Sequence, residues 1–179
     1  MTATIRAAVL ARRPVDARER ESIAKFIEQL DRLTSPFDEH ADRVHVTTSA
    51  ILVSDDRRRV LLHKHKRLGL WLQPGGHIDA GELPWDGAAR EACEETGLPA
   101  VLVNTDLLHV DVHPGPRKHI HLDLRYLVES PLVAPSPPED ESQEVEWFAW
   151  HQAIDLAQGM DELGANGIYF RVHHFARQQ

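Results

Sequence analysis

The sequence predicts an α/β or α+β domain in which helices pack on a β-sheet. Short runs of β-branched and aliphatic residues, separated by turn-forming residues, alternate along the chain with stretches in which apolar residues recur at helical intervals. A sheet and the helices that interrupt it in sequence bury their apolar faces against each other in one layered core. With 179 residues, of which 42% are hydrophobic, the chain is long enough for one such core.

The first predicted element is an amphipathic helix over residues 15–34. Charged residues alternate there with apolar residues at helical spacing, and "TSPF" ends the pattern. The apolar positions are Ile23, Phe26, Ile27, Leu30 and Leu33. Such a stripe has to be buried, either on the core of the same chain or across a homodimer interface. The sequence leaves both possibilities open.

A hairpin and a second helix follow. "HVTTSAILVS" and "RVLLHKH" are apolar runs joined by the polar turn "DDRR", so we expect a β-hairpin over residues 44–65. "LGLWLQPGG" is a bent, glycine-rich connection. Residues 84–96 are predicted to be helical, because Pro84 suits the first helical position and Gly97 suits the position just after the last turn.

The remaining elements are shorter. Strands are expected around residues 100–112 and 118–128, followed by the proline-rich acidic loop "SPLVAPSPPEDES". "EVEWFAW" is predicted to be the last strand. Residues 151–158 and 161–176 are predicted to form two terminal helices.

Composition narrows the function. A net charge of −8, from 28 acidic and 20 basic residues, argues against binding nucleic acid through phosphate neutralisation. The apolar run in the opening segment is too short to be the core of a signal peptide. No apolar stretch has the length needed to span a membrane. The one cysteine, Cys93, has no partner for an internal disulfide. We therefore expect a cytoplasmic protein.

Three glutamates are crowded on the helix predicted for residues 84–96. Glu91, Glu94 and Glu95 stand at i, i+3 and i+4, so their carboxylates share one helix face about 5–6 Å apart and repel each other. A divalent cation would remove the repulsion, and oxygen ligands suit Mg²⁺ or Mn²⁺. The glycines at 75 and 76 allow the backbone to approach, so a carbonyl such as that of Gly76 is a further candidate ligand. A solvated acidic face is the alternative.

The longer segment resembles the Nudix box. The matching positions, at the spacing of that motif, are Gly76, Glu82, Arg90, Glu91, Ala92, Glu94, Glu95, Gly97 and Leu98. The resemblance implies a Nudix fold over residues 44–179, with a mixed β-sheet between helices, and places residues 1–43 outside it as a helical extension. It also implies Mg²⁺- or Mn²⁺-dependent hydrolysis of a nucleoside diphosphate linked to another moiety. Leu83 departs from the polar cap expected at the helix start, which Glu82 or backbone groups would then supply.

The resemblance also assigns roles. Gly76, Glu94 and Glu95 are expected to bind the metal, and Glu91 is expected either to bind it or to act as the base that orients water. Arg90 is expected to pair with Glu82 and hold the loop against the helix. Other members of the family take the base from a later loop. Here that base is Glu141 or Glu144, unless the loop is merely a solvated acidic segment.

Ionisable residues alternate with apolar ones in "HVDVHPGPRKHIHLDLRY". This pattern predicts a hairpin with one apolar side and one ionisable side, turned at "PGPR". The ionisable residues are His109, Asp111, His113, His119, His121, Asp123 and Arg125. Facing a cleft, they would bind phosphate and ribose or hold Zn²⁺; facing water, they are ordinary surface. His77, directly after the two glycines, is a further candidate.

A basic run and one proline complete the candidate residues. "HKHKR" ends a strand before the box, so Lys66 and Arg67 either steer an anionic substrate or are only a charged strand end. Pro114 lies sixteen residues after Leu98, a position at which the ADP-ribose-cleaving branch of the family commonly has proline, although a hairpin turn also explains it.

The substrate is expected to be a phosphorylated small molecule derived from a nucleotide. ADP-ribose, nucleotide sugars, nucleoside triphosphates and dinucleotide polyphosphates all remain open. Two other classes are compatible with the fold: a non-catalytic nucleotide sensor, and an isomerase of isoprenoid diphosphates. The complete box argues against a sensor, and Cys93, on the box helix, does not correspond to the catalytic cysteine of such an isomerase.

Overall fold

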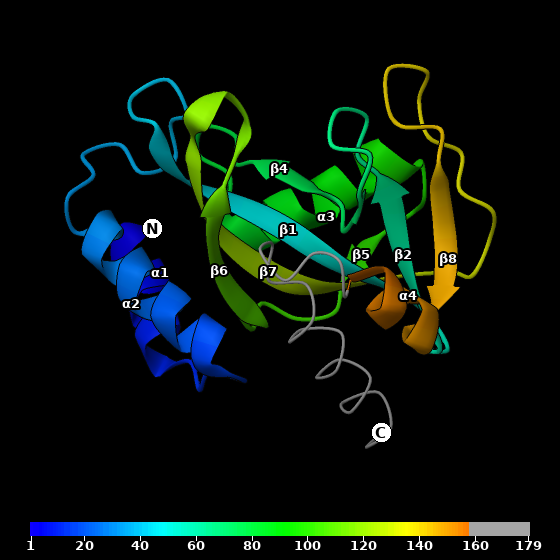
Figure 1. Ribbon diagram of the computed structural model, residues 1–179, viewed down its shortest axis with the longest axis horizontal. Coiled ribbons are helices and arrows are strands. Elements are labelled where there is room, and N and C mark those ends of the chain that lie inside the picture. The colour runs from blue at the N-terminus through cyan, green and yellow to red at the C-terminus, as the bar shows by residue number, and fades with distance from the viewer. Residues whose placement is uncertain (158–179) are drawn as a thin grey trace.

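The computed structural model describes residues 1–157 and contains a mixed β-sheet with helices on both faces (Figure 1). The strands are β1 Val44–Ser54, β2 Arg59–Lys64, β3 Trp71–Leu72, β4 Gly75–His77, β5 Val101–Leu102, β6 His109–Pro114, β7 Ile120–Ser130 and β8 Val145–Ala149. The helices are α1 Thr2–Ala11, α2 Ala17–Leu30, α3 Pro84–Thr96 and α4 Trp150–Ala157, with a 3-10 turn, η1, at Pro116–Lys118. The predicted fold class is confirmed.

The centre of the sheet is a long parallel pair. β1 and β7 run parallel over eleven paired positions, and the path β3-β2-β1-β7-β5 extends from them to both sides. β4 pairs with β1, β6 with β7 and β8 with β2, all antiparallel. The predicted hairpin is present as β1 and β2, turned at Arg57, which has a positive φ of 56°. β1 therefore pairs with both the glycine-rich strand β4 and strand β7, which carries His121.

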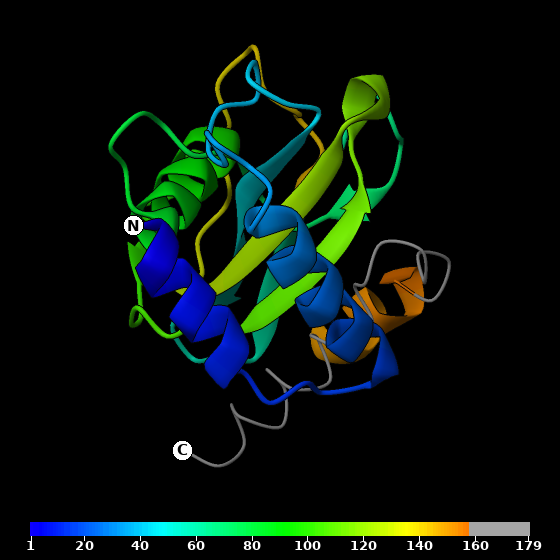
Figure 2. The same cartoon turned by 90° about the vertical axis from the view of Figure 1, so that its left-hand side faces the viewer.

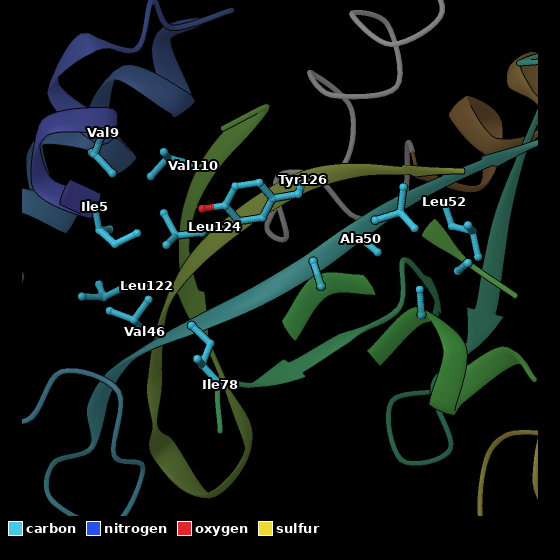
Figure 3. Packing of buried hydrophobic residues seen from close by; sticks show 14 of the residues in the cluster. Ile5, Val9, Val46, Ala50, Leu52, Ile78, Val110, Leu122, Leu124 and Tyr126 are labelled. Atoms are coloured by element: carbon cyan, nitrogen blue, oxygen red, sulfur yellow. The ribbon is translucent and has the colours of Figure 1, made fainter. Parts of the chain in front are cut away.

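Alternation along β1 and β7 separates the two faces of the sheet. Even-numbered residues such as Val46 and Leu124 face the main core, which α1, α2 and α3 cover (Figure 3). Odd-numbered residues face the other side, where Ile51 and Leu127 pack under α4. Nearer the N-terminal ends of these strands the odd-numbered face is polar, and the candidate binding pocket lies there.

Helix α3 has the bounds that the sequence predicts. Pro84 occupies the first helical position, and Gly97 ends the helix in the left-handed conformation at φ 67°, its amide donating to the Cys93 carbonyl. Leu83 at the N-cap makes no side-chain cap hydrogen bond. Glu82 does not cap the helix either, because its carboxylate accepts hydrogen bonds from the Asp79 amide and from Arg90.

The N-terminal region holds two helices where the sequence predicts one. α2 corresponds to the prediction for residues 15–34, and its first turn is capped by Asp16, which accepts from the Glu19 amide. α1 was not predicted, because only two of its residues, Ile5 and Val9, face the core and its apolar pattern is weak. Figure 2 shows α2 lying across β6 and α1 beside α2.

The apolar stripe of α2 is buried on the core of its own chain. Phe26 and Leu30 are buried in the main cluster. The helix also covers the edge of the sheet, since the amides of Val110 and Val112 in β6 donate to Glu19 and Ser22. An exposed strand edge would otherwise present unpaired amides to other chains.

Two strands also differ from the prediction. The strand expected at 100–112 is divided into β5 and β6, because residues 103–108 form an irregular link in which the Asp106 amide donates to the Asn104 side chain. β7 begins at Ile120 and not at 118, since η1 occupies the preceding residues. β8 and α4 lie where expected, while the helix predicted at 161–176 falls outside the described residues. Within residues 1–157, no helix has the length and apolar character needed to cross a membrane.

Replacing Phe26 tests the packing of α2. Because the side chain is fully buried, Phe26→Ala should lower the free energy of unfolding by about 3–5 kcal/mol. Lys25→Ala, at the adjacent exposed position, should change it by less than about 0.5 kcal/mol. Urea unfolding followed by circular dichroism measures both, and equal stability of the two variants would show that α2 is not part of the core.

Candidate active site

The box helix and strand β4 meet through two glycines. The amide of Gly75 donates to Glu95 Oε2 over 2.9 Å. At Gly76 an added Cβ would lie 2.5 Å from Glu91 Oε1, so only glycine fits at this point without moving the carboxylate. The two carboxylates are thus held directly against the backbone of β4.

The three box glutamates differ in exposure. Glu91 and Glu95 lie between α3 and β4, each with 15% of its side chain exposed, whereas Glu94 is 56% exposed at the rim. Glu91 and Glu94 both accept hydrogen bonds from one Arg90 nitrogen, Nη1, at 3.0 and 2.8 Å. The structure therefore brings the three predicted acidic residues together beside Gly76, two of them inside the site and one at its edge.

Arg90 ties the loop to the helix. Its guanidinium donates to both oxygens of Glu82 at 2.9 Å and to the His77 carbonyl at 2.8 Å. A bidentate arginine–carboxylate pair fixes both distance and orientation. The hydrogen bond from Arg90 lowers the pKa of Glu82, and the surrounding carboxylates raise that of Arg90. Through these contacts Arg90 fixes the position of the loop that carries His77 and Glu82 relative to helix α3.

The inner carboxylates are costly to ionise as they stand. Burial raises the pKa of Glu95 to about 8, against the opposing hydrogen bond from the Gly75 amide. Burial likewise raises the pKa of Glu91, which Arg90 partly offsets. The Glu91 and Glu95 carboxylates, held against the β4 glycines, are hard oxygen donors, and such donors fit Mg²⁺ or Mn²⁺.

A pocket of about 550 Å³ opens beside the same strand. It lies on the odd-numbered face of the sheet and shares β4 with the carboxylates. Both polar and apolar residues line it. The lining includes Thr47, Ser49, His63, Leu70, Leu72, Gly75, Gly76, His77, His113, His121, Asp123 and Arg125.

The floor of the pocket is a buried charge network. Arg125 donates to Asp123 Oδ2 at 2.8 Å and to Asp111 Oδ2 at 3.0 Å, and the Ser49 hydroxyl donates to Asp123. Burial opposes ionisation of Asp111, but Arg125 and His113 outweigh it and hold its pKa below the usual value. Of the two orientations open from the sequence, part of the ionisable side of the hairpin faces this pocket: His113, His121, Asp123 and Arg125 line it.

The other candidates occupy different places. His109 is buried and does not line the pocket; burial lowers its pKa well below the usual value. His119 lies beside His45, with ring centres 5.1 Å apart. Lys66 and Arg67 are exposed outside the pocket lining, and the Lys66 ammonium donates to the Asp140 carbonyl.

The two candidate bases in the late loop also differ. Glu141 is near enough to Glu95 to raise its pKa by charge repulsion. Glu144 is paired with Lys64 at 2.7 Å and is 60% exposed. The geometry therefore brings Glu141, and not Glu144, toward the box carboxylates.

Two histidines of the site were not singled out from the sequence. His63 lines the pocket, and its Nδ1 lies 3.8 Å from Glu95 Oε1, within electrostatic reach but too long for a hydrogen bond. Burial lowers its pKa to about 4. His45 is fully buried beside His77. Their signal was present, since both interrupt predicted apolar strands at positions facing inward.

Comparison with known proteins agrees with this geometry. A family model described as the NUDIX domain matches residues 43–167. The chain belongs to the Nudix family. Phosphatase NudJ of Escherichia coli K12 is 28% identical over 114 residues, covering 64% of this chain and 72% of NudJ.

Solved structures show the same fold. A Nudix hydrolase from Clostridium perfringens superposes with a TM-score of 0.60 and 26% identity, over 76% of this chain and 98% of that protein. An Ap4A hydrolase of C. elegans has a TM-score of 0.63 at 18% identity, over 75% and 98% respectively. The predictions of a Nudix fold and of a Nudix-type pyrophosphohydrolase are confirmed.

The raised pKa of Glu95 gives the metal-free Nudix protein a distinctive pH dependence. The folded chain keeps a proton on Glu95 until about pH 8, whereas the unfolded chain releases it near the ordinary value of 4.5, so the Glu95 contribution to stability falls as pH rises between these values. In EDTA, the unfolding free energy of the wild type minus that of Glu95→Gln should fall by up to about 1.4 kcal/mol per pH unit and level off above about pH 8.

Urea unfolding of both proteins between pH 5 and pH 9 measures this difference. Glutamine keeps an oxygen that accepts the Gly75 amide hydrogen bond but has no titrating group, which makes it the matched variant. Unfolding free energies that run parallel over the whole range would show that Glu95 ionises normally in the folded chain.

Proposed function

We propose that this protein is a divalent-metal-dependent hydrolase that cleaves the diphosphate bond of a nucleoside diphosphate linked to another moiety. The observation that carries the proposal is the burial of Glu91 and Glu95 against the β4 glycines, at the edge of a pocket large enough for a nucleotide-sized ligand. Family membership and the similarity to NudJ, which is named a phosphatase, support the same chemistry.

In this proposal Glu94 and Glu95 hold Mg²⁺ or Mn²⁺ together with the carbonyl of Gly76, and Glu91 either joins them as a ligand or acts as the base. When bound, such ions neutralise the charge of a diphosphate, polarise its phosphorus and lower the pKa of an attacking water. Arg90 positions the carboxylates through its contacts with Glu82, Glu91 and Glu94. Its role is to hold the site together, because its donors are directed at these side chains and at the His77 carbonyl.

The base that accepts the proton of water is either Glu91 or a loop glutamate. Glu91 is partly desolvated and has a raised pKa, as a base working near neutral pH requires. In the loop, Glu141 is favoured over Glu144, because Glu144 is engaged by Lys64. Comparing kcat against pH for Glu91→Gln and Glu141→Gln identifies the base, since only its loss removes the acidic limb of the profile.

The pocket suggests how the rest of the substrate is held. In this proposal Leu70 and Leu72 of the lining suit the flat face of a base, and the ring nitrogens of His77, His113 and His121 are available to ribose hydroxyls and phosphate oxygens. Arg125 is already paired with two aspartates, so it serves mainly to fix the polar floor. These contacts are compatible with ADP-ribose, nucleotide sugars and nucleoside triphosphates.

A substrate panel tests the proposal. Each compound is incubated with Mg²⁺ or Mn²⁺ in ¹⁸O-labelled water, and phosphorus NMR shows whether a diphosphate is split and which phosphorus gains the label. Cleavage to two phosphorylated products supports the proposal. Binding without turnover for every compound would identify a sensor, and rearrangement of an isoprenoid diphosphate would identify an isomerase.

Glutamine substitutions separate catalysis from stability. Glu94→Gln and Glu95→Gln should each lower kcat at least about a hundredfold under saturating Mg²⁺, because each removes a charged ligand from the site. Glu28→Gln, which alters an exposed carboxylate on α2, serves as the matched control and should leave kcat unchanged. Full activity of either box variant at saturating Mg²⁺ would overturn the metal assignment.

A further inference from the structure

Three histidines from different strands meet at one end of the pocket. His45 lies on β1, His77 on β4 and His121 on β7, and register places them side by side: His45 pairs with His121, and His77 pairs with Thr47 two residues farther along β1. One ring nitrogen from each lies within 4.8 Å of the other two. No two of the three are neighbours in sequence.

The nitrogens of His45 and His77 are spaced like two ligands of one metal ion. His45 Nε2 and His77 Nε2 are 3.2 Å apart. A tetrahedral ion with metal–nitrogen bonds of about 2.0–2.1 Å holds its ligands about 3.3–3.4 Å apart. A hydrogen bond between two rings would also explain this one distance, but it does not account for the third imidazole, whose ring centre is 5.1 Å from that of His45.

The surroundings suit a cation. The Glu39 carboxylate lies 3.3 Å from His77 Nε2 and adds negative charge beside the group. Gly115 packs against the His121 ring, because a Cβ at this position would overlap ring nitrogen Nε2, so only glycine fits beside the imidazole. His77 and His121 also line the pocket, which gives an ion held by these nitrogens access to a ligand there.

We propose that His45, His77 and His121 form a binding site for a Zn²⁺-class transition-metal ion, separate from the carboxylate site of the Nudix box. Imidazole nitrogens prefer Zn²⁺, Co²⁺, Ni²⁺ or Cu²⁺, whereas the oxygen donors of Glu91 and Glu95 prefer Mg²⁺ or Mn²⁺. Three protein ligands leave one tetrahedral position open, as at catalytic zinc sites. The histidine site and the carboxylate site should therefore bind different ions, because one offers nitrogen donors and the other oxygen donors.

The test uses the full chain, stripped with a chelator and then titrated with Zn²⁺ by calorimetry and with Co²⁺ by visible absorption. Four-coordinate Co²⁺ absorbs much more strongly than the six-coordinate ion expected among carboxylates. One equivalent of Co²⁺ should give the intense spectrum, and excess Mg²⁺ should not remove it. Zn²⁺ should displace it stoichiometrically.

Variants assign the ligands. His77→Asn and His121→Asn should each weaken Zn²⁺ binding more than tenfold and abolish the intense Co²⁺ spectrum. His77 is a suitable first target because its side chain is 44% exposed and its loss leaves the core intact. His40→Asn, at an exposed imidazole nearby in sequence, is the matched control and should bind normally. Thermal unfolding of the metal-free variants verifies that each is folded.

The box variant Glu95→Gln separates the two sites. It should bind Zn²⁺ as the wild type does. Absence of stoichiometric Zn²⁺ binding to the wild type would overturn the proposal, as would binding that survives His77→Asn and His121→Asn but is lost in Glu95→Gln. Because the readout is metal binding, the result is independent of whether the protein hydrolyses any diphosphate compound.

Discussion

The close contact between the β4 backbone and the α3 carboxylates is the constraint on which the site depends. Gly76 leaves no room for a side chain next to Glu91, and the Gly75 amide is within hydrogen-bond distance of Glu95. A carboxylate this buried resists ionisation, so the arrangement stores an electrostatic cost that a bound cation would offset. For the neighbouring Glu91, Arg90 offsets part of the same cost through its ion pair with that carboxylate.

The parallel pair β1 and β7 gives the sheet two different faces. On one face, even-numbered residues build the core beneath α3 and the N-terminal helices; on the other, Ser49, Asp123 and Arg125 bring buried charge to the pocket. A buried arginine between two aspartates adds little net stability, because desolvation consumes most of the attraction. We therefore explain Arg125 beneath the pocket by its role in positioning the two aspartates, and not by a contribution to the stability of the fold.

The sequence predicted best what local rules decide. The bounds of α3 follow from Pro84 and Gly97, and the β1–β2 hairpin follows from two apolar runs and a polar turn. Helix α1 was missed, since a helix with two buried positions has little periodicity. The division of the strand expected at 100–112 was missed for another reason: its residues pair with β7, and that register is a tertiary property.

Strand β4 is where local and long-range determinants meet. At residue 77 the carbonyl accepts from Arg90 of the box, while the imidazole of the same residue contacts His45 across the pair with β1. Periodicity indicated that His121 belongs to an ionisable face, but the meeting of residues 45, 77 and 121 depends on a parallel pairing across more than seventy residues. Because the backbone and side chain of His77 belong to different groups, a shift of this three-residue strand acts on the carboxylates and the imidazoles together.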